Sequence, residues 1–340
     1  MKIAYFYLTK QGEELVQKIS SQKPGDIFGK EDFKENMKAA FTSYDALICV
    51  MATGIVVRTL APLLVHKTKD PAVLVLDQNG NYVISLLSGH IGGANELAKE
   101  IANCTKGEAV LTTATDVSGK LAFDVFAKKN QLGIENIEML KWISGALVDG
   151  KRVDVIANEP IPYIFDEQIK KVEHPGNYPL VVIDETLYVD TNKPVLYLRP
   201  KNISIGVGCT KNREAKAISE ALKIVLREEK IHPCRVANIA TIPLKSKEEG
   251  IIALAREYNV PLKIISKEKI EGLDFDSLNI NQSAFVKTTT GLPSVSTACA
   301  YLASYKGKII RDKAKFKGIT IAVAKKENKI YSAISDNSFR

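Results

Sequence analysis

Residues 81–104, NYVISLLSGHIGGANELAKEIANC, decide how this chain folds. The first part, Asn81–Leu87, is apolar and rich in β-formers, which is typical of a buried strand. The last part, Ala94–Cys104, has apolar residues at helical spacing. The loop between them, Ser88–Gly93, holds three glycines and His90. We therefore expect a strand-to-helix turn that places backbone N–H groups beside an imidazole.

Such a turn is typical of an anion site, because free N–H groups and the positive end of the helix dipole meet at a helix N-terminus. Glycine lets the backbone approach a ligand without a Cβ in the way, and histidine is the side chain that titrates near neutral pH. A plain tight turn, in which His90 only packs or forms a hydrogen bond, explains the same residues equally well.

Strands alternate with helices around that stretch. Residues 46–52, ALICVMA, form a continuous apolar run, as expected for a strand covered on both faces. Asn79-Gly80 between two apolar runs is a strong hairpin signal, and a second alternating series begins at Ile203–Val207. We expect an α/β protein, with two α/β domains of mostly parallel sheets joined by a small β-rich middle segment.

The proline-rich stretch before residue 201 sets the expected domain boundaries. We expect an N-terminal α/β domain at 1–133 that carries the catalytic loops. The middle segment is expected at 134–201, and the C-terminal α/β domain at 202–340.

Composition limits the classes of function. The chain has 340 residues, 45% hydrophobic and 25% charged, which is ordinary for a soluble globular protein. No apolar run reaches the roughly 18 residues of a membrane helix, and the N-terminus lacks the pattern of a signal peptide, so we expect a cytoplasmic protein. Five scattered cysteines without a CxxC pair argue for reduced thiols and against a zinc or iron–sulfur site. No metal site is expected.

The net charge of +8 favours acidic partners. The lysines are spread along the chain and form no basic block, so nucleic acid is the weaker option. A polyanionic small molecule fits better, and a basic surface without a function also remains open.

Three predicted strand ends carry polar loops: Thr53-Gly54, Ser88–His90 and Thr112–Asp116. In parallel sheets the ligand crevice lies beyond the carboxyl ends of the strands. If these strands are neighbours, we expect the three loops to converge on one crevice. Arg58 follows the first loop within an apolar segment, and arginine grips carboxylates with two hydrogen bonds. In the C-terminal part, Gly206–Lys211 begins like a dinucleotide fingerprint but has a lysine at the third glycine.

Four runs of the chain stand out: SGHIGGAN at 88–95, TTATDVSGK at 112–120, ISIGVGCTKNREA at 203–215 and TGLPSVSTACAYLAS at 290–304. Together they resemble the cobalt-precorrin-5A hydrolase family, CbiG, of anaerobic vitamin B12 synthesis, and the first two are the specific motifs. The resemblance covers residues 45–130 and 203–325. The GVGCTKN loop departs from the more arginine-rich form of the family.

The resemblance implies a hydrolase that opens the δ-lactone of a cobalt-bound contracted tetrapyrrole and releases acetaldehyde. The cobalt belongs to the substrate, so the protein needs no cofactor of its own. For this reaction we expect His90 to act as the acid or base. The N–H groups of Gly92 and Gly93 would donate hydrogen bonds to the oxyanion of the tetrahedral intermediate. Asp116 would orient His90 or cap a helix. The expected substrate-binding residues come from the same strand ends: Thr53, Gly54, Arg58, Ser88, Gly89, Asn95, Thr112, Thr113, Asp116, Cys209 and Lys211.

Two other functions fit the same loops: a non-enzymatic carrier of a tetrapyrrole intermediate, and an enzyme acting on a phosphorylated small molecule. The expected partners are an anionic cobalt-corrinoid, neighbouring methyltransferases in transient contact, and a second copy in a homodimer. No nucleic acid and no membrane are expected among them.

Overall fold

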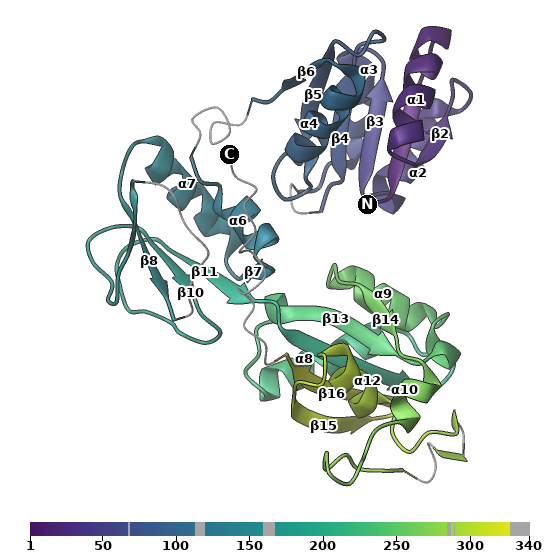
Figure 1. Cartoon of the computed structure of the whole chain (residues 1–340), viewed down its shortest axis with the longest axis vertical. Helices are drawn as coiled ribbons and strands as arrows, with labels where there is room; N and C mark the ends of the chain where they lie inside the picture. The colour runs from purple at the N-terminus through teal and green to yellow at the C-terminus, as the bar shows by residue number, and fades with distance from the viewer. Residues whose placement is uncertain (67–68, 113–119, 159–166, 284–286, 289, 327–340) are drawn as a thin grey trace. The chain divides into compact units, whose positions relative to one another are not determined.

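The computed structural model describes residues 1–66, 69–112, 120–158, 167–283, 287–288 and 290–326. They form two compact units: one contains Met1–Lys128 and Ser144–Lys151, and the other contains Lys129–Ile143 and most of the described chain after Arg152. Figure 1 shows three sheets, one of six strands and two of five. Two are largely parallel α/β sheets and the one between them in sequence is β-rich, so the expected fold class is confirmed.

The N-terminal sheet has the strand order β2-β1-β3-β4-β5-β6. Its strands are β1 (Ile3–Tyr7), β2 (Asp26–Phe28), β3 (Ala46–Val50), β4 (Ala72–Leu76), β5 (Tyr82–Leu87) and β6 (Glu108–Val110). Its helices are α1 (Lys10–Gln22), α2 (Phe33–Ser43), α3 (Thr53–Leu60) with the 3₁₀ turn η1 (Ala61–Leu63), α4 (Ala94–Thr105) and α6 (Phe123–Lys129).

Helices cover both faces of this sheet, which explains the unbroken apolar runs of β3 and β4. On one face, Ile48 and Leu74 pack with residues of α1 and α4. On the other, Leu47 and Val75 pack with residues of α2 and α3. In Figure 1, α1 and α4 lie in front of the purple and blue strands.

The strands of the sheet do not all run the same way. β1, β2, β3 and β4 are parallel to one another, whereas β5 is antiparallel to β4 and parallel to β6. The reversal follows from the Asn79-Gly80 turn, where Gly80 has a φ of +73°, and confirms the expected hairpin. The carboxyl ends of β5 and β6 therefore lie at the opposite edge of the sheet from the carboxyl ends of β1, β3 and β4.

The expected convergence of three loops on one crevice is consequently wrong. Thr53-Gly54 follows β3 at one edge, while the loop after β5 lies where β4 begins. There, Ser88 Oγ donates a hydrogen bond to the carbonyl oxygen of Asp70 at 2.9 Å. Thr112 follows β6 and shares the edge of Ser88. Thr113 and Asp116 lie outside the described residues.

The second unit carries two sheets. The middle one has the order β7-β11-β10-β8-β9, with only β7 antiparallel, and the C-terminal one has the order β14-β13-β12-β16-β15, with β15 and β16 antiparallel. The strands are β7 (Leu132–Ile134), β8 (Val153–Ala157), β9 (Ile169–Lys171), β10 (Leu180–Ile183), β11 (Val195–Pro200), β12 (Ile203–Cys209), β13 (Val236–Thr241), β14 (Leu262–Ile264), β15 (Lys308–Phe316) and β16 (Ile319–Lys325). The helices are η2 (Ile137–Met139), α7 (Leu140–Val148), α8 (Ala215–Glu228), η3 (Pro233–Arg235), η4 (Pro243–Lys245), α9 (Glu249–Glu257), α10 (Lys267–Glu271) and α12 (Ser296–Ala303).

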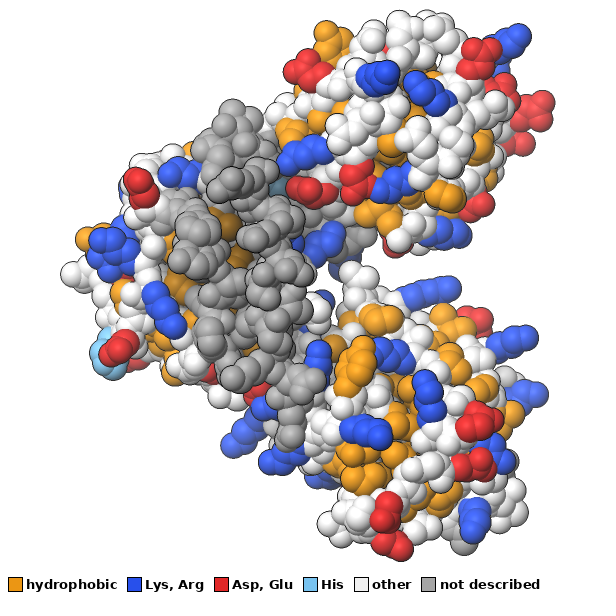
Figure 2. All heavy atoms as spheres, in the orientation of Figure 1, with side chains coloured by type: hydrophobic (Ala, Val, Ile, Leu, Met, Phe, Trp, Pro, Cys, Tyr) orange, Lys and Arg blue, Asp and Glu red, His pale blue; other side chains and the backbone are white. Residues whose placement is uncertain are grey.

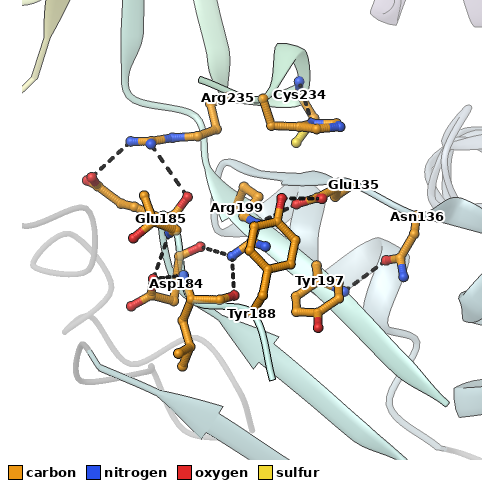
Figure 3. A network of polar contacts seen from close by, with 12 residues as sticks. Glu135, Asn136, Asp184, Glu185, Tyr188, Tyr197, Arg199, Cys234 and Arg235 are labelled. Carbon is orange, nitrogen blue, oxygen red and sulfur yellow. Dashed lines mark hydrogen bonds and ion pairs between the residues drawn. The ribbon is translucent and has the colours of Figure 1, made fainter. Parts of the chain in front are cut away.

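A buried arginine organises the middle sheet (Figure 3). Arg199 on β11 is fully buried, and its Nε donates to Glu135 Oε2 at 2.6 Å. Its guanidinium carbon lies 4.6 and 4.7 Å from the ring centroids of Tyr188 and Tyr197, and these two rings contact each other with centroids 5.1 Å apart. Burial raises the pKa of Glu135, but hydrogen bonds from Tyr188 and Arg199 lower it more, so the carboxylate stays ionised at neutral pH.

A second ion cluster ties this sheet to the C-terminal sheet within the unit. Glu185 accepts from Lys325 at 2.8 Å and from Arg235 at 3.0 Å. Asn202 donates to Glu185 at 2.7 Å and accepts from Arg235 at 2.9 Å. These contacts connect Glu185, in the loop after β10, to Arg235 of η3, Lys325 of β16 and the residue just before β12.

Basic side chains are dispersed over the surface. Figure 2 shows Lys and Arg side chains scattered among acidic and apolar ones on the face that it draws. None of the helices in the described part of the chain has the length and apolar character that crossing a bilayer requires.

Candidate functional site

Three backbone hydrogen bonds close the turn from β5 into α4. Gly93 N donates to His90 O at 3.1 Å, Ala94 N to Ser88 O at 3.2 Å, and Asn95 N to Gly89 O at 2.9 Å. Gly93 has a φ of +88°, a conformation that favours glycine. Its N–H is therefore not free for an oxyanion, and the role expected for Gly93 does not fit this geometry. The N–H of Gly92 has no acceptor within the described chain.

Close packing explains the other two glycines. A Cβ at Gly89 would lie 2.7 Å from Asn95 Oδ1, and a Cβ at Gly92 would collide with Ser88 and lie 2.7 Å from its carbonyl oxygen. Asn95 is only 3% exposed, and its Oδ1 accepts from Ser85 Oγ at 2.6 Å. Gly89 and Asn95 thus hold the loop together, which is a structural role.

His90 forms an ion pair with an acidic residue from α6. His90 Nδ1 lies 3.1 Å from Asp124 Oδ2, and the two side chains are 13% and 12% exposed. Burial raises the pKa of Asp124, but the hydrogen bond and charge of His90 and the N–H groups of Val125 and Asp124 lower it more. The pKa of the Asp124 carboxyl is therefore below its ordinary 3.8, and the group is ionised at neutral pH.

The same helix contacts the loop a second time. Lys128, one turn after Asp124, donates from Nζ to the carbonyl oxygen of Ile91 at 3.1 Å. Positions four apart lie on one helix face, so α6 presents a carboxylate and an ammonium group to the loop. The carboxylate contacts Nδ1 and so fixes the orientation of the His90 ring.

Sequence reasoning missed Asp124. It lies 34 residues after His90 and looks like an ordinary acidic residue in the first turn of an amphipathic helix. Asp116 is the residue that the sequence offers for orienting His90 or for capping a helix. Nothing in the spacing of Asp124 connects it to His90.

A crevice of about 500 Å³ opens at the other edge of the same sheet. The strand order reverses between β1 and β3, and ligands bind at such switch points in open α/β sheets. The lining residues are Leu8, Thr9, Val50, Met51, Ala52, Thr53, Ile55, Val75, Leu76, Asp77, Gln78, Tyr82, Ile84 and Val110. The carboxylate of Asp77 is occupied, because it accepts from the N–H groups of Asn79 and Tyr82 at 2.9 and 2.8 Å.

Arg58 belongs to this edge. It is exposed on α3, and its guanidinium turns back toward the start of the helix, where a Cβ on Gly54 would lie 3.1 Å from Arg58 Nη1. Thr53, Gly54 and Arg58 are therefore together, as expected. They lie at the opposite edge from Ser88 and His90.

The loop after β12 donates a backbone hydrogen bond to a carboxylate of the chain itself. Asn212 N donates to Glu248 Oε2 at 2.9 Å, and Glu248 also accepts from Lys245 at 2.9 Å. This carboxylate takes the place expected for a ligand anion. Burial raises the pKa of the Cys209 thiol above its ordinary 9.0, so Cys209 is protonated at neutral pH. Lys211, two residues after Cys209, is exposed.

Metal-binding chemistry has no obvious place among the described residues, where no three His, Cys, Asp or Glu side chains come together in a way that would hold an ion.

Three family models match the chain in succession. They are cobalamin synthesis G N-terminal at residues 35–116, the cobalamin biosynthesis central region at 121–200, and cobalamin synthesis G C-terminus at 203–324.

Full-length relatives agree with these models. The cobalt-precorrin-5A hydrolase of Salmonella typhimurium is 31% identical over 94% of this chain and 97% of its own length. That of Priestia megaterium is 33% identical over 85% of this chain and 80% of its own. A solved structure of a cobalamin biosynthesis protein G homolog from Sulfolobus solfataricus is 25% identical, covers 96% of this chain and 97% of that one, and has a TM-score of 0.42. From the family models and the full-length relatives together, this chain belongs to the CbiG family.

Proposed function

We propose that this chain is a cobalt-precorrin-5A hydrolase, which opens the δ-lactone of its substrate and releases acetaldehyde during cobalamin synthesis. Its family membership supports the reaction. The single structural observation that carries the proposal is the 3.1 Å contact between His90 and Asp124.

The reaction needs one proton transfer at each stage. Water attacks the lactone carbonyl, the acyl–oxygen bond breaks, and the oxygen of water ends in the new carboxylate. The hydroxyl group released from the lactone becomes the aldehyde oxygen when the carbon–carbon bond to the ring breaks. The electron pair and a proton then pass to the ring. In the first stage an imidazole accepts a proton from water and returns it to the leaving oxygen; in the second it accepts the proton of the released hydroxyl group.

The residues of the loop divide these tasks. His90 is the general acid and base, and ionised Asp124 stabilises the imidazolium that forms when His90 takes up a proton. The N–H of Gly92, for which the described residues offer no acceptor, is a donor for the oxyanion of the tetrahedral intermediate. Thr112, exposed at the same edge, is placed to contact the periphery of the substrate.

Incubation of the purified chain with cobalt-precorrin-5A tests the proposal. We expect acetaldehyde, detected by an alcohol dehydrogenase coupled assay, in an amount equal to the substrate consumed. Tight binding of the substrate without acetaldehyde would contradict the hydrolase and favour the carrier. No binding of the tetrapyrrole would contradict both.

A further inference from the structure

A basic groove of about 580 Å³ lies beside the crevice. It runs between α2 and α3, and its lining residues are Leu8, Phe33, Lys34, Lys38, Ile55, Arg58, Thr59 and Pro62. Leu8 and Ile55 line both the groove and the crevice. The two hollows are therefore neighbours at the carboxyl ends of β1 and β3.

Three cations in the groove have no partner of opposite charge. Lys34, Lys38 and Arg58 are exposed, none forms an ion pair with a described residue, and the lining contains no carboxylate. Lys245, by contrast, is paired with Glu248. Three uncompensated cations around an apolar hollow favour a ligand with several negative groups.

The crevice offers an apolar wall next to these charges. Tyr82, Ile84 and Leu86 alternate along β5 and so share one face of the sheet. Tyr82 is 53% exposed, and Ile84 and Leu86 are half-buried, although they lie on the face where α2 and α3 cover the central strands. This open face accepts a flat apolar body.

We propose that the basic groove and the open face of β5 together bind the substrate macrocycle. The ring lies on Tyr82 and Ile84, and its carboxylate arms reach Lys34, Lys38 and Arg58. This inference rests on the proposed function for the identity of the ligand. It adds two lysines and an apolar wall that the loop chemistry did not indicate.

The position of His90 constrains how the ligand lies. Tyr82 and Leu87 are the two ends of β5, about 17 Å apart for a strand of this length. The groove lies beside β1 and β3, at the same end of the sheet as Tyr82 but two strands away from β5, and the His90 loop follows Leu87. A substrate that uses both must extend along β5, so that the reacting lactone faces His90 while arms on the opposite side of the ring occupy the groove.

A binding measurement with uroporphyrin III, a tetrapyrrole with a rim of carboxylates, tests the groove directly. The triple variant Lys34→Gln, Lys38→Gln and Arg58→Gln removes its charge. We expect binding about tenfold weaker or more, from three exposed ion pairs, and a smaller dependence of the affinity on salt concentration.

A matched control removes charge from the other face of the sheet. Lys18 on α1 and Lys99 on α4 are exposed, and the buried residues of both helices pack against the opposite face. Lys18→Gln with Lys99→Gln should bind uroporphyrin III within about twofold of wild type, since distant surface charges are screened. Equal affinity of the wild type and the triple variant for uroporphyrin III would overturn the proposal that the groove binds the macrocycle. A loss of affinity in the control as large as in the triple variant would overturn it too.

Turnover separates this inference from the proposed function. With cobalt-precorrin-5A, the triple variant should show a raised KM and a nearly unchanged kcat. Acetaldehyde release with an unchanged KM would overturn the groove while the hydrolase stands. A chain that binds uroporphyrin III through the groove but releases no acetaldehyde would leave the groove standing and refute the hydrolase.

Discussion

Replacing Asp124 by Asn tests the partner of His90 at nearly constant size. The two side chains are about one-eighth exposed and lie 3.1 Å apart, so little water screens their interaction. A hydrogen bond of this charged kind contributes about 1.5–3 kcal/mol. We expect the free energy of unfolding of Asp124→Asn at pH 7 to fall by about that amount, measured by urea titration with far-UV circular dichroism.

The dependence on pH has a defined sign. Because the folded pKa of Asp124 is below its ordinary 3.8, the ionised carboxylate stabilises the folded state. That contribution is fully present above pH 3.8 and is lost as the pH falls through the lower, folded pKa. The difference in stability between wild type and Asp124→Asn should therefore shrink as the pH falls below 3.8.

Acetaldehyde release gives the second readout of this variant. Without the carboxylate, His90 loses its orientation and the stabilisation of its protonated form, so we expect kcat to fall by about 10²–10⁴-fold. Asp149→Asn is the control, since that exposed carboxylate pairs only with exposed Lys151 and its loss should cost less than about 0.5 kcal/mol. An Asp124→Asn variant with normal stability and normal turnover would refute the reasoning.

Two further substitutions test the loop and the middle sheet. Gly92→Ala places a Cβ 2.7 Å from the carbonyl oxygen of Ser88, so we expect thermal denaturation to show a loss of about 1–3 kcal/mol in the free energy of unfolding. Gly145→Ala is the control, because a Cβ there meets no atom within 4 Å and should be neutral or stabilising. Equal losses in the two variants would contradict the packing argument. Arg199→Met leaves the carboxylate of Glu135 without its cation and should cost about 3–5 kcal/mol. Adding Glu135→Gln to that variant should recover part of the loss, and additive losses would contradict a direct pairing.

The sequence predicted the elements of the N-terminal sheet better than their geometry. Periodicity located the helix of residues 94–105 within one residue of its end, and Asn79-Gly80 predicted the hairpin. The same hairpin implies that β5 is antiparallel to β4, so that its loop must lie at the opposite edge from Thr53. The prediction that the loops converge was wrong because it treated β5 as parallel to β3 and β4, whereas an antiparallel β5 ends at the opposite edge of the sheet.

The candidate site could be predicted only in part. His90 follows from its place in a glycine-rich turn. Asp124 could not be found, because a long-range contact across 34 residues leaves no periodic signal. The glycines were interpreted as a ligand cradle, whereas Gly89 and Gly93 serve the turn itself through close contact and positive φ. Glycine-rich loops satisfy both demands with the same residues, so local sequence does not separate them.

The central claim is that His90 transfers the proton in lactone opening. Single-turnover acetaldehyde release from cobalt-precorrin-5A by His90→Gln measures it most directly, with His174→Gln, an exposed histidine of the other unit, as the control. The account predicts a rate about 10²–10⁴-fold lower for His90→Gln, with unchanged substrate affinity, and a normal rate for His174→Gln. A normal rate of release by His90→Gln would contradict it.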